Sequence, residues 1–247
     1  FPKLDHLEKA VTDQIRTFQR SFLELARKQE TSNTDLVNGY GMLGQLYHAY
    51  EMFDSAELCY SNAIHLAPKE FTWHHLLAFL YEKTGRLPEA VRNYQSVKEL
   101  RPDYTAASEH LGNLYLQLNQ LEDARKEFET ALSLAPDSPA AQNGLGQIAL
   151  FEKDYQAAIR HFQTALKQGP GANRLHYSLA MAYRGMGNLE EAKSHLAQSG
   201  TVGIRPVDPL ADGLSEMIQG EHIHMVNGQM AFRAGRYREA AALFAKA

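Results

Sequence analysis

The chain has 247 residues, of which 44% are hydrophobic and 22% are charged, a composition typical of a folded protein rather than a disordered one. Its net charge of −4, with both signs interspersed, provides no basic surface for nucleic acid or anionic lipid. No apolar run approaches the roughly 18 residues that a membrane span needs, so we expect a soluble protein without membrane insertion.

The two ends of the sequence suggest a piece of a longer protein. The first methionine is Met42, and the sequence stops at Ala247, inside a pattern that is described below. We therefore expect a fragment whose leader was removed or whose start was trimmed. The location stays open, but a removed leader would favour the periplasm over the cytoplasm.

Residues 1–36 are expected to form a capping helix and a linker. Apolar residues recur there at alternating steps of three and four, which places them on one face of a helix. These residues are Leu4, Leu7, Val11, Ile15, Phe18, Phe22 and Leu25. Because the first repeat of a helical-repeat protein needs a cover for its apolar end, we expect this helix to cap the repeats that follow. The alternative is a seam between two chains, since the stripe is close to a heptad.

From residue 37 onward a 34-residue pattern recurs. Its clearest part is an alanine, an aromatic residue four places later, a smaller residue three places after that, and a closing proline. It occurs at AELCYSNAIHLAP (56–68), AVRNYQSVKELRP (90–102), ARKEFETALSLAP (124–136) and AIRHFQTALKQGP (158–170). Upstream, small residues keep the same step: Gly44, Ala78, Gly112, Gly146 and Ala180. We divide this region into repeats one to five: 37–70, 71–104, 105–138, 139–172 and 173–206.

Each repeat is predicted to contain a first helix, a polar turn and a second helix that a proline ends. The small residue on the first helix lets the second helix approach closely. Repeat five departs from the pattern, because Leu196 stands in the aromatic place and Pro206 comes two places late. We therefore expect a shorter or looser end to its second helix.

The pattern Leu-Gly…Tyr…Ala…Phe/Tyr…Ala…Pro resembles the tetratricopeptide repeat, and this signature is present in repeats one to four. The resemblance implies an all-α fold, a right-handed superhelical solenoid of stacked antiparallel helix pairs. It also implies an extended concave groove, lined by the first helices, that binds other proteins. The composition of the repeats resembles that of bacterial members of the family.

Beyond Pro206 the period breaks. We expect a helical insertion at 207–220 and a truncated sixth repeat at 221–247. Asp208 followed by Pro209 is a good helix start, so we predict one long helix over 209–233, bent near Gly220. The second helix of the sixth repeat is expected to begin near Tyr237.

The cysteine and histidine content predicts no metal site and no cofactor. The single cysteine, Cys59, excludes an internal disulfide and is expected to be a small buried residue. His222 and His224 are two residues apart, so on a helix they point in nearly opposite directions and do not share an ion easily. The alternative is a metal held by His222 and a residue of the preceding insertion.

The residues at the second, fifth, ninth and twelfth places of each repeat are expected to face the groove, because they lie opposite the core stripe. Carboxamides recur at the ninth place. An amide side chain both donates and accepts, so a row of them would hold an extended peptide by its main chain. The alternative is ordinary surface polarity. The partner-binding residues that we predict are Gln45, His75, Phe79, Glu109, Asn113, Asn143, Gln147, Arg174, Tyr177, Met181 and Arg184.

The sequence contains no nucleophile elbow, zinc-binding helix motif or phosphate loop. We therefore predict a non-enzymatic scaffold that binds a partner polypeptide, as an extended segment, in the groove. The alternative is a substrate-docking or regulatory arm of a larger enzyme whose catalytic domain lies beyond Ala247. A dimer formed through the N-terminal helix is a further alternative.

Overall fold

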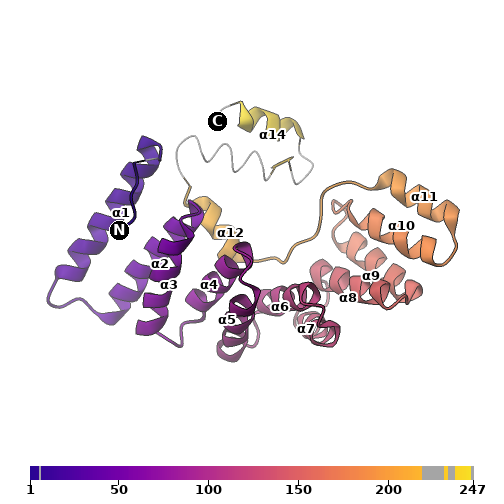
Figure 1. Ribbon diagram of the computed structural model, residues 1–247, viewed down its shortest axis with the longest axis horizontal. Helices are drawn as coiled ribbons and strands as arrows, with labels where there is room; N and C mark the ends of the chain where they lie inside the picture. Colours follow the sequence, from indigo (N-terminus) through magenta and orange to yellow (C-terminus); the bar gives the residue numbers. More distant parts are fainter. Residues whose placement is uncertain (6, 219–230, 233–236, 246–247) are drawn as a thin grey trace. The chain divides into compact units, whose positions relative to one another are not determined.

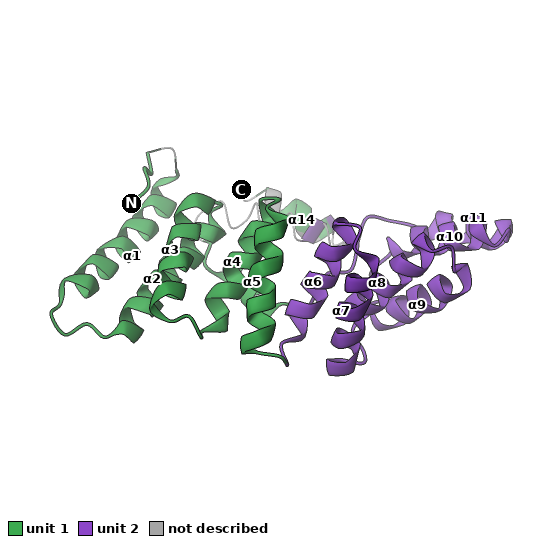
Figure 2. Ribbon diagram, turned by 60° about the horizontal axis from the view of Figure 1, so that its bottom comes forward, with its two compact units in different colours: residues 1–102, 208–229, 238–247 green, residues 103–207, 230–237 purple. Residues whose placement is uncertain are grey.

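The computed structural model describes residues 1–5, 7–218, 231–232 and 237–245, and every regular element in these ranges is a helix (Figure 1). The chain divides into two compact units (Figure 2). Unit 1 comprises residues 1–102, 208–229 and 238–247, and unit 2 comprises residues 103–207 and 230–237. The predicted all-α fold of stacked helix pairs is confirmed.

Unit 1 contains the N-terminal helix, two helix pairs and a short later helix. Helices α2 and α3 pack together, as do α4 and α5, and α3 also contacts α4. Their bounds are α1 Lys9–Arg27, α2 Asn33–Ala49, α3 Phe53–Leu66, α4 Phe71–Lys83, α5 Leu87–Leu100 and α12 Pro209–Glu216. One more helix near the end of the chain is α14, Tyr237–Phe244, which starts where we expect the second helix of repeat six.

Unit 2 contains three helix pairs, α6 with α7, α8 with α9 and α10 with α11. Their bounds are α6 Thr105–Gln117, α7 Leu121–Leu134, α8 Pro139–Phe151, α9 Tyr155–Gln168, α10 Leu175–Gly185 and α11 Leu189–Gln198. Helix α11 has 10 residues, whereas α3, α5, α7 and α9 have 14 each. The predicted shortening of the second helix in repeat five is therefore confirmed.

In the helix pairs of repeats one to four, an aromatic ring of the second helix is buried opposite the small residue of the first. Tyr60, Tyr94, Phe128 and Phe162 all have fully buried side chains, and each follows its small residue by 16 positions. A Cβ added at Gly112 would lie 2.6 Å from the Phe128 ring, and one at Gly144 of the next helix pair would lie 2.3 Å from it. Phe128 is therefore held from both sides. In repeat five Leu196, which replaces the ring, is 43% exposed.

A residue with left-handed backbone conformation follows each of the first helices α2, α4, α6, α8 and α10. Glu51, Gly85, Asn119, Lys153 and Gly187 have φ between 58° and 82° and are spaced 34 residues apart. After each of them the chain turns back, and the next backbone N–H bonds the carbonyl five residues earlier, as from Arg86 to Tyr81 at 2.8 Å. This is a Schellman turn, in which glycine has no steric cost. The same turn therefore sets the angle between the two helices of each of these pairs.

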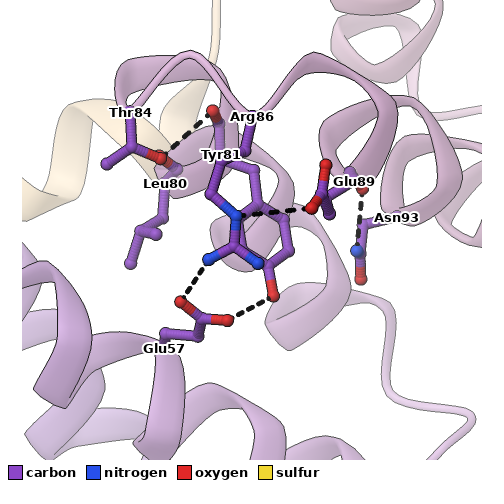
Figure 3. Close-up of polar contacts among 7 residues, drawn as sticks. All are labelled: Glu57, Leu80, Tyr81, Thr84, Arg86, Glu89 and Asn93. Atoms are coloured by element: carbon purple, nitrogen blue, oxygen red, sulfur yellow. Dashed lines mark hydrogen bonds and ion pairs between the residues drawn. The ribbon is translucent and has the colours of Figure 1, made fainter.

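Polar contacts connect the first helix pair of unit 1 to the second (Figure 3). Glu57 of α3 accepts a hydrogen bond from the Tyr81 hydroxyl at 2.9 Å and one from the Arg86 guanidinium at 2.7 Å. The guanidinium also lies over the Tyr81 ring, 4.3 Å from its centroid. In unit 2 Arg125 takes the place equivalent to Glu57, and it pairs with Glu152 at 2.7 Å. At these two junctions the equivalent position carries opposite charges, Glu57 in one and Arg125 in the other, and each forms an ion pair with the next helix pair.

Helix α1 packs against α2, in the position expected of a cap. Val11 and Ile15 of its apolar stripe are buried, and the Phe22 ring lies 4.7 Å from that of Tyr40. The Gln19 amide donates a hydrogen bond to the Tyr47 hydroxyl at 2.9 Å. The alternative role of this helix, a seam between two chains, stays a prediction.

The structure confirms the predicted burial of the single cysteine. Cys59 is buried, as predicted, and burial raises the pKa of its thiol to about 11.

The prediction of one long helix over 209–233 is wrong, because α12 ends at Glu216 and Met217 forms its C-cap. Residues 219–230 lie outside the described residues, as does the His222 metal alternative. No helix in the described parts of the chain is both long and apolar enough to cross a membrane.

The close contact at Gly112 predicts a large effect of a small substitution. Gly112→Ala should lower the free energy of unfolding by about 1–3 kcal/mol, because Phe128 is held from both sides and cannot move away from the new methyl group. Thermal and denaturant unfolding would measure the change. Gly171→Ala is the matched control, since a Cβ there meets nothing within 4 Å. If the Gly112 and Gly171 variants are equally stable, the aromatic contact does not have the role assigned to it.

Candidate functional site

The fifth and ninth places of a repeat are one helical turn apart, so they lie on the same face of a first helix. In unit 2 the first helices α6, α8 and α10 are neighbours, because α8 contacts both of the others. These places therefore form one row across the three helices. We call the following residues of this row the unit 2 stripe: Asn113, Asn143, Gln147, Tyr177 and Met181.

The three carboxamides of the unit 2 stripe are accessible and have no internal partner. Gln147 is exposed, and Asn113 and Asn143 are half-buried. Their amide groups form no hydrogen bond within the described part of the chain, whereas Gln142 on the same helix bonds His161 at 2.8 Å. A buried or half-buried amide normally finds a partner, so these three are available to a bound molecule.

On α10 the unit 2 stripe carries an aromatic residue and a methionine instead of carboxamides. The Tyr177 side chain is 54% exposed, and Met181 lies half-buried one turn later. Arg174 and Arg184 are exposed near the two ends of the same helix, and neither forms an ion pair within the described residues. Helix α10 therefore offers an aromatic ring between two positive charges.

Glu109, the fifth-place residue of α6, requires a correction, because it is buried and does not face an open groove. Its carboxylate accepts a hydrogen bond from the Ser138 hydroxyl. That hydroxyl in turn accepts the Ala141 N–H at 3.0 Å and caps the start of α8. Glu109 thus fixes α6 to the N-terminus of α8. The sequence held one signal of this arrangement, the Ser138–Pro139 helix start.

His75, the fifth-place residue of α4 in unit 1, requires the same correction, because its side chain is fully buried. Its Nε2 lies 2.7 Å from a carboxylate oxygen of Asp208, which is also buried. The remaining predicted residues of unit 1, Gln45 and Phe79, are half-buried. The fifth place of α4 is therefore not open to a partner, because Asp208 lies against it.

His48, at the twelfth place of repeat one, lies inside a cluster of aromatic rings. Its ring centroid is 5.8 Å from that of Phe53, 6.0 Å from that of Tyr60 and 5.7 Å from that of Phe79. Burial, and to a lesser extent the positive charge of Lys83, lowers the pKa of His48 to about 3. The histidine is therefore neutral in the folded protein at neutral pH.

Three family models with the description "tetratricopeptide repeat" match residues 69–137, 110–173 and 149–200. Together they span residues 69–200, more than half of the chain. A comparison with curated proteins gives no match.

Solved structures of three proteins have a similar fold. MamA from Desulfovibrio magneticus RS-1 has a TM-score of 0.63 at 19% identity, covering 66% of this chain and 93% of that one. YrrB, described as a TPR protein with an unusual peptide-binding site, has a TM-score of 0.59 at 18% identity, covering 82% and 99%. A tetratricopeptide repeat protein from Parabacteroides merdae has a TM-score of 0.59 at 18% identity, covering 95% and 92%. At these identities the likeness concerns the fold alone.

Acidification should destabilise the fold through His48. The unfolded chain binds the proton near pH 6.5, whereas the folded protein resists it down to about pH 3. The unfolded state therefore binds more protons between these values, so the stability is fully present above pH 6.5 and is lost as the pH falls. By about pH 5 this single histidine should cost about 2 kcal/mol.

Thermal midpoints of the wild type and of His48→Phe between about pH 7.5 and pH 5 would measure this effect. The variant should lose part of the pH dependence, because phenylalanine keeps a ring in the cluster but does not titrate. His65→Phe changes an exposed histidine of α3 and should leave the wild-type dependence intact. Equal pH dependence in the wild type and in His48→Phe would contradict the assignment.

Proposed function

The chain belongs to the tetratricopeptide repeat family, and on that premise we propose that it is a non-enzymatic scaffold whose unit 2 stripe holds an extended segment of a partner protein. Repeats of this family are generally non-catalytic interaction modules, and YrrB is a relative in fold with a peptide-binding site. The division of residues 37–206 into five repeats, with a sixth begun at 221–247, is part of the same proposal.

The observation that carries the proposal is the set of three carboxamides without internal partners, Asn113, Asn143 and Gln147. Each offers an oxygen acceptor and an N–H donor, which are the groups that a peptide main chain also has. Such pairing does not depend on the partner's side chains. It therefore suits a partner that is held by its backbone along several residues.

The spacing of the helices fits an extended peptide. Packed helices lie roughly 8–10 Å apart, and an extended chain rises about 3.3 Å per residue. Amides on neighbouring first helices therefore meet every third residue of the partner. On α8, Asn143 and Gln147 are about 6 Å apart and meet residues two apart. The spacing of the amides on α6 and α8 thus matches the rise per residue of an extended peptide, so the peptide does not need to bend.

Helix α10 adds selectivity to this backbone recognition. Arg174 and Arg184 favour an acidic group at that end of the partner, and the exposed Tyr177 ring supplies an apolar contact between them. We propose that the partner segment carries an acidic residue or a terminal carboxylate where it crosses α10. The charge contribution should weaken as the salt concentration rises.

Replacing the three carboxamides tests the proposal. Asn113→Ala/Asn143→Ala/Gln147→Ala should weaken binding of the partner segment by more than about tenfold, because each lost hydrogen bond costs about 0.5–1.5 kcal/mol. The partner would be captured from an extract of the native cell and identified by mass spectrometry. Its bound segment would then be synthesised and titrated calorimetrically against each variant.

The matched control removes three carboxamides that lie off the unit 2 stripe, as Gln120→Ala/Gln156→Ala/Gln198→Ala. These side chains are exposed on the second helices or just before them. The control should bind the segment as the wild type does, and both triple variants should unfold cooperatively. Equal losses in the two variants, or no loss in either, would refute the stripe as the binding surface.

A further inference from the structure

Within the described residues, α12 is not paired with a neighbouring helix in the way that the helices of the repeats are. It packs across the first helices of unit 1, in contact with both α2 and α4 (Figure 1). It comes from the insertion between repeats five and six and has no counterpart in the other repeats. Leu214 of α12 and Ile218 just beyond it are buried. A segment from the later part of the chain therefore covers a surface built by the first third.

The start of α12 is attached to α4 through a single aspartate with two roles. One carboxylate oxygen of Asp208 accepts the Ala211 N–H at 3.2 Å and caps the helix, with Pro209 at its first position. The other oxygen lies 2.7 Å from Nε2 of His75. His75 stands at the fifth place of its repeat, the place that Asn143 and Tyr177 occupy in the unit 2 stripe.

The end of α12 is attached to α1 by a second set of hydrogen bonds. The Gln14 amide donates to the Met217 carbonyl at 2.8 Å, and its oxygen accepts a hydrogen bond from the Tyr50 hydroxyl at 2.5 Å. Tyr50 is the C-cap residue of α2. Side chains from α1, α2 and α4 thus fasten both ends of α12.

An isolated helix of eight residues is not stable in water, so α12 depends on the surface that it covers. A short helix that is ordered by the surface of two other helices and anchored through its cap and its leucine has the features of a bound peptide ligand. We propose that the α2–α4 face of unit 1 is a docking site for a short helix with an Asp-Pro-Leu start. The chain fills this site with α12, and a partner bearing the same motif binds by displacing it.

This site is separate from the proposed function, which rests on α6, α8 and α10. The occupant is defined by the chain's own segment: an aspartate that caps the helix and reaches His75, a proline at the first position, and apolar residues at the places of Leu214 and Ile218. Release of α12 would expose an apolar face and a histidine that is otherwise buried. The attachment of α12 therefore works as an autoinhibitory contact that blocks binding of a partner to the α2–α4 face.

A labelled peptide of residues 206–218 tests the docking site in the full-length chain. Leu214→Asp should free the site by weakening the attachment of α12, because a charge replaces its buried leucine. The peptide should then bind at least tenfold more tightly to this variant than to the wild type, in which the tethered helix competes at high effective concentration. Adding His75→Ala should abolish the gain. Glu216→Gln, an exposed change on α12, should bind the peptide as the wild type does.

Hydrogen exchange provides a second readout that does not require peptide binding. The amides of Ala211 and Asp212 should exchange at least tenfold faster in Leu214→Asp, while those of α2 stay protected. Equal peptide affinity in the wild type and Leu214→Asp, or unchanged affinity after His75→Ala, would overturn the proposal. So would faster exchange throughout α2, since α12 would then be part of the core. A wild-type molar mass twice that of the chain, lost in Leu214→Asp, would assign the site to a second copy.

Discussion

The packing of one aromatic ring on one small residue is the contact on which the rest of the structure depends. Tyr60, Tyr94, Phe128 and Phe162 are fully buried, and the glycines opposite three of them leave no room for even a methyl group. This contact fixes the distance between the two helices of a pair. It recurs every 34 residues in repeats one to four. Where the ring is lost, at Leu196, the second helix is shorter and the leucine is partly exposed.

Equivalent places of the repeats have different surroundings in this chain. In unit 2 Gln147 and Tyr177 are exposed and Asn143 is half-buried, whereas Glu109, at the fifth place of α6, is buried. In unit 1 the fifth place of α4 is His75, and α12 is attached there through Asp208. The attachment of α12 indicates that a first-helix surface of this chain can hold a peptide segment. It therefore supports, by analogy within one molecule, the proposal that the unit 2 stripe holds a partner.

Sequence reasoning succeeded where the deciding contact recurs at the 34-residue period. The ring, the small residue and the turn are all within a few tens of residues, and their period makes them visible. It failed at polar side chains whose partners the repeat pattern does not mark: Glu109 meets Ser138 at the end of the same repeat, and His75 meets Asp208, 133 residues away. Both side chains are polar and occupy places opposite the core stripe, so the pattern assigned them to solvent. The end of α12 at Glu216 was also missed, because the apolar spacing beyond it continues to favour a helix.

Site-specific photo-crosslinking in the native cell would test the central claim most directly. A photoreactive phenylalanine analogue would replace Tyr177, which is exposed on the unit 2 stripe, and in a second strain Gln156, which is exposed on α9. Our account predicts a covalent adduct with one partner protein at position 177 and none at position 156. Adducts with that partner at position 156 alone would place the interface on the second helices and contradict the account.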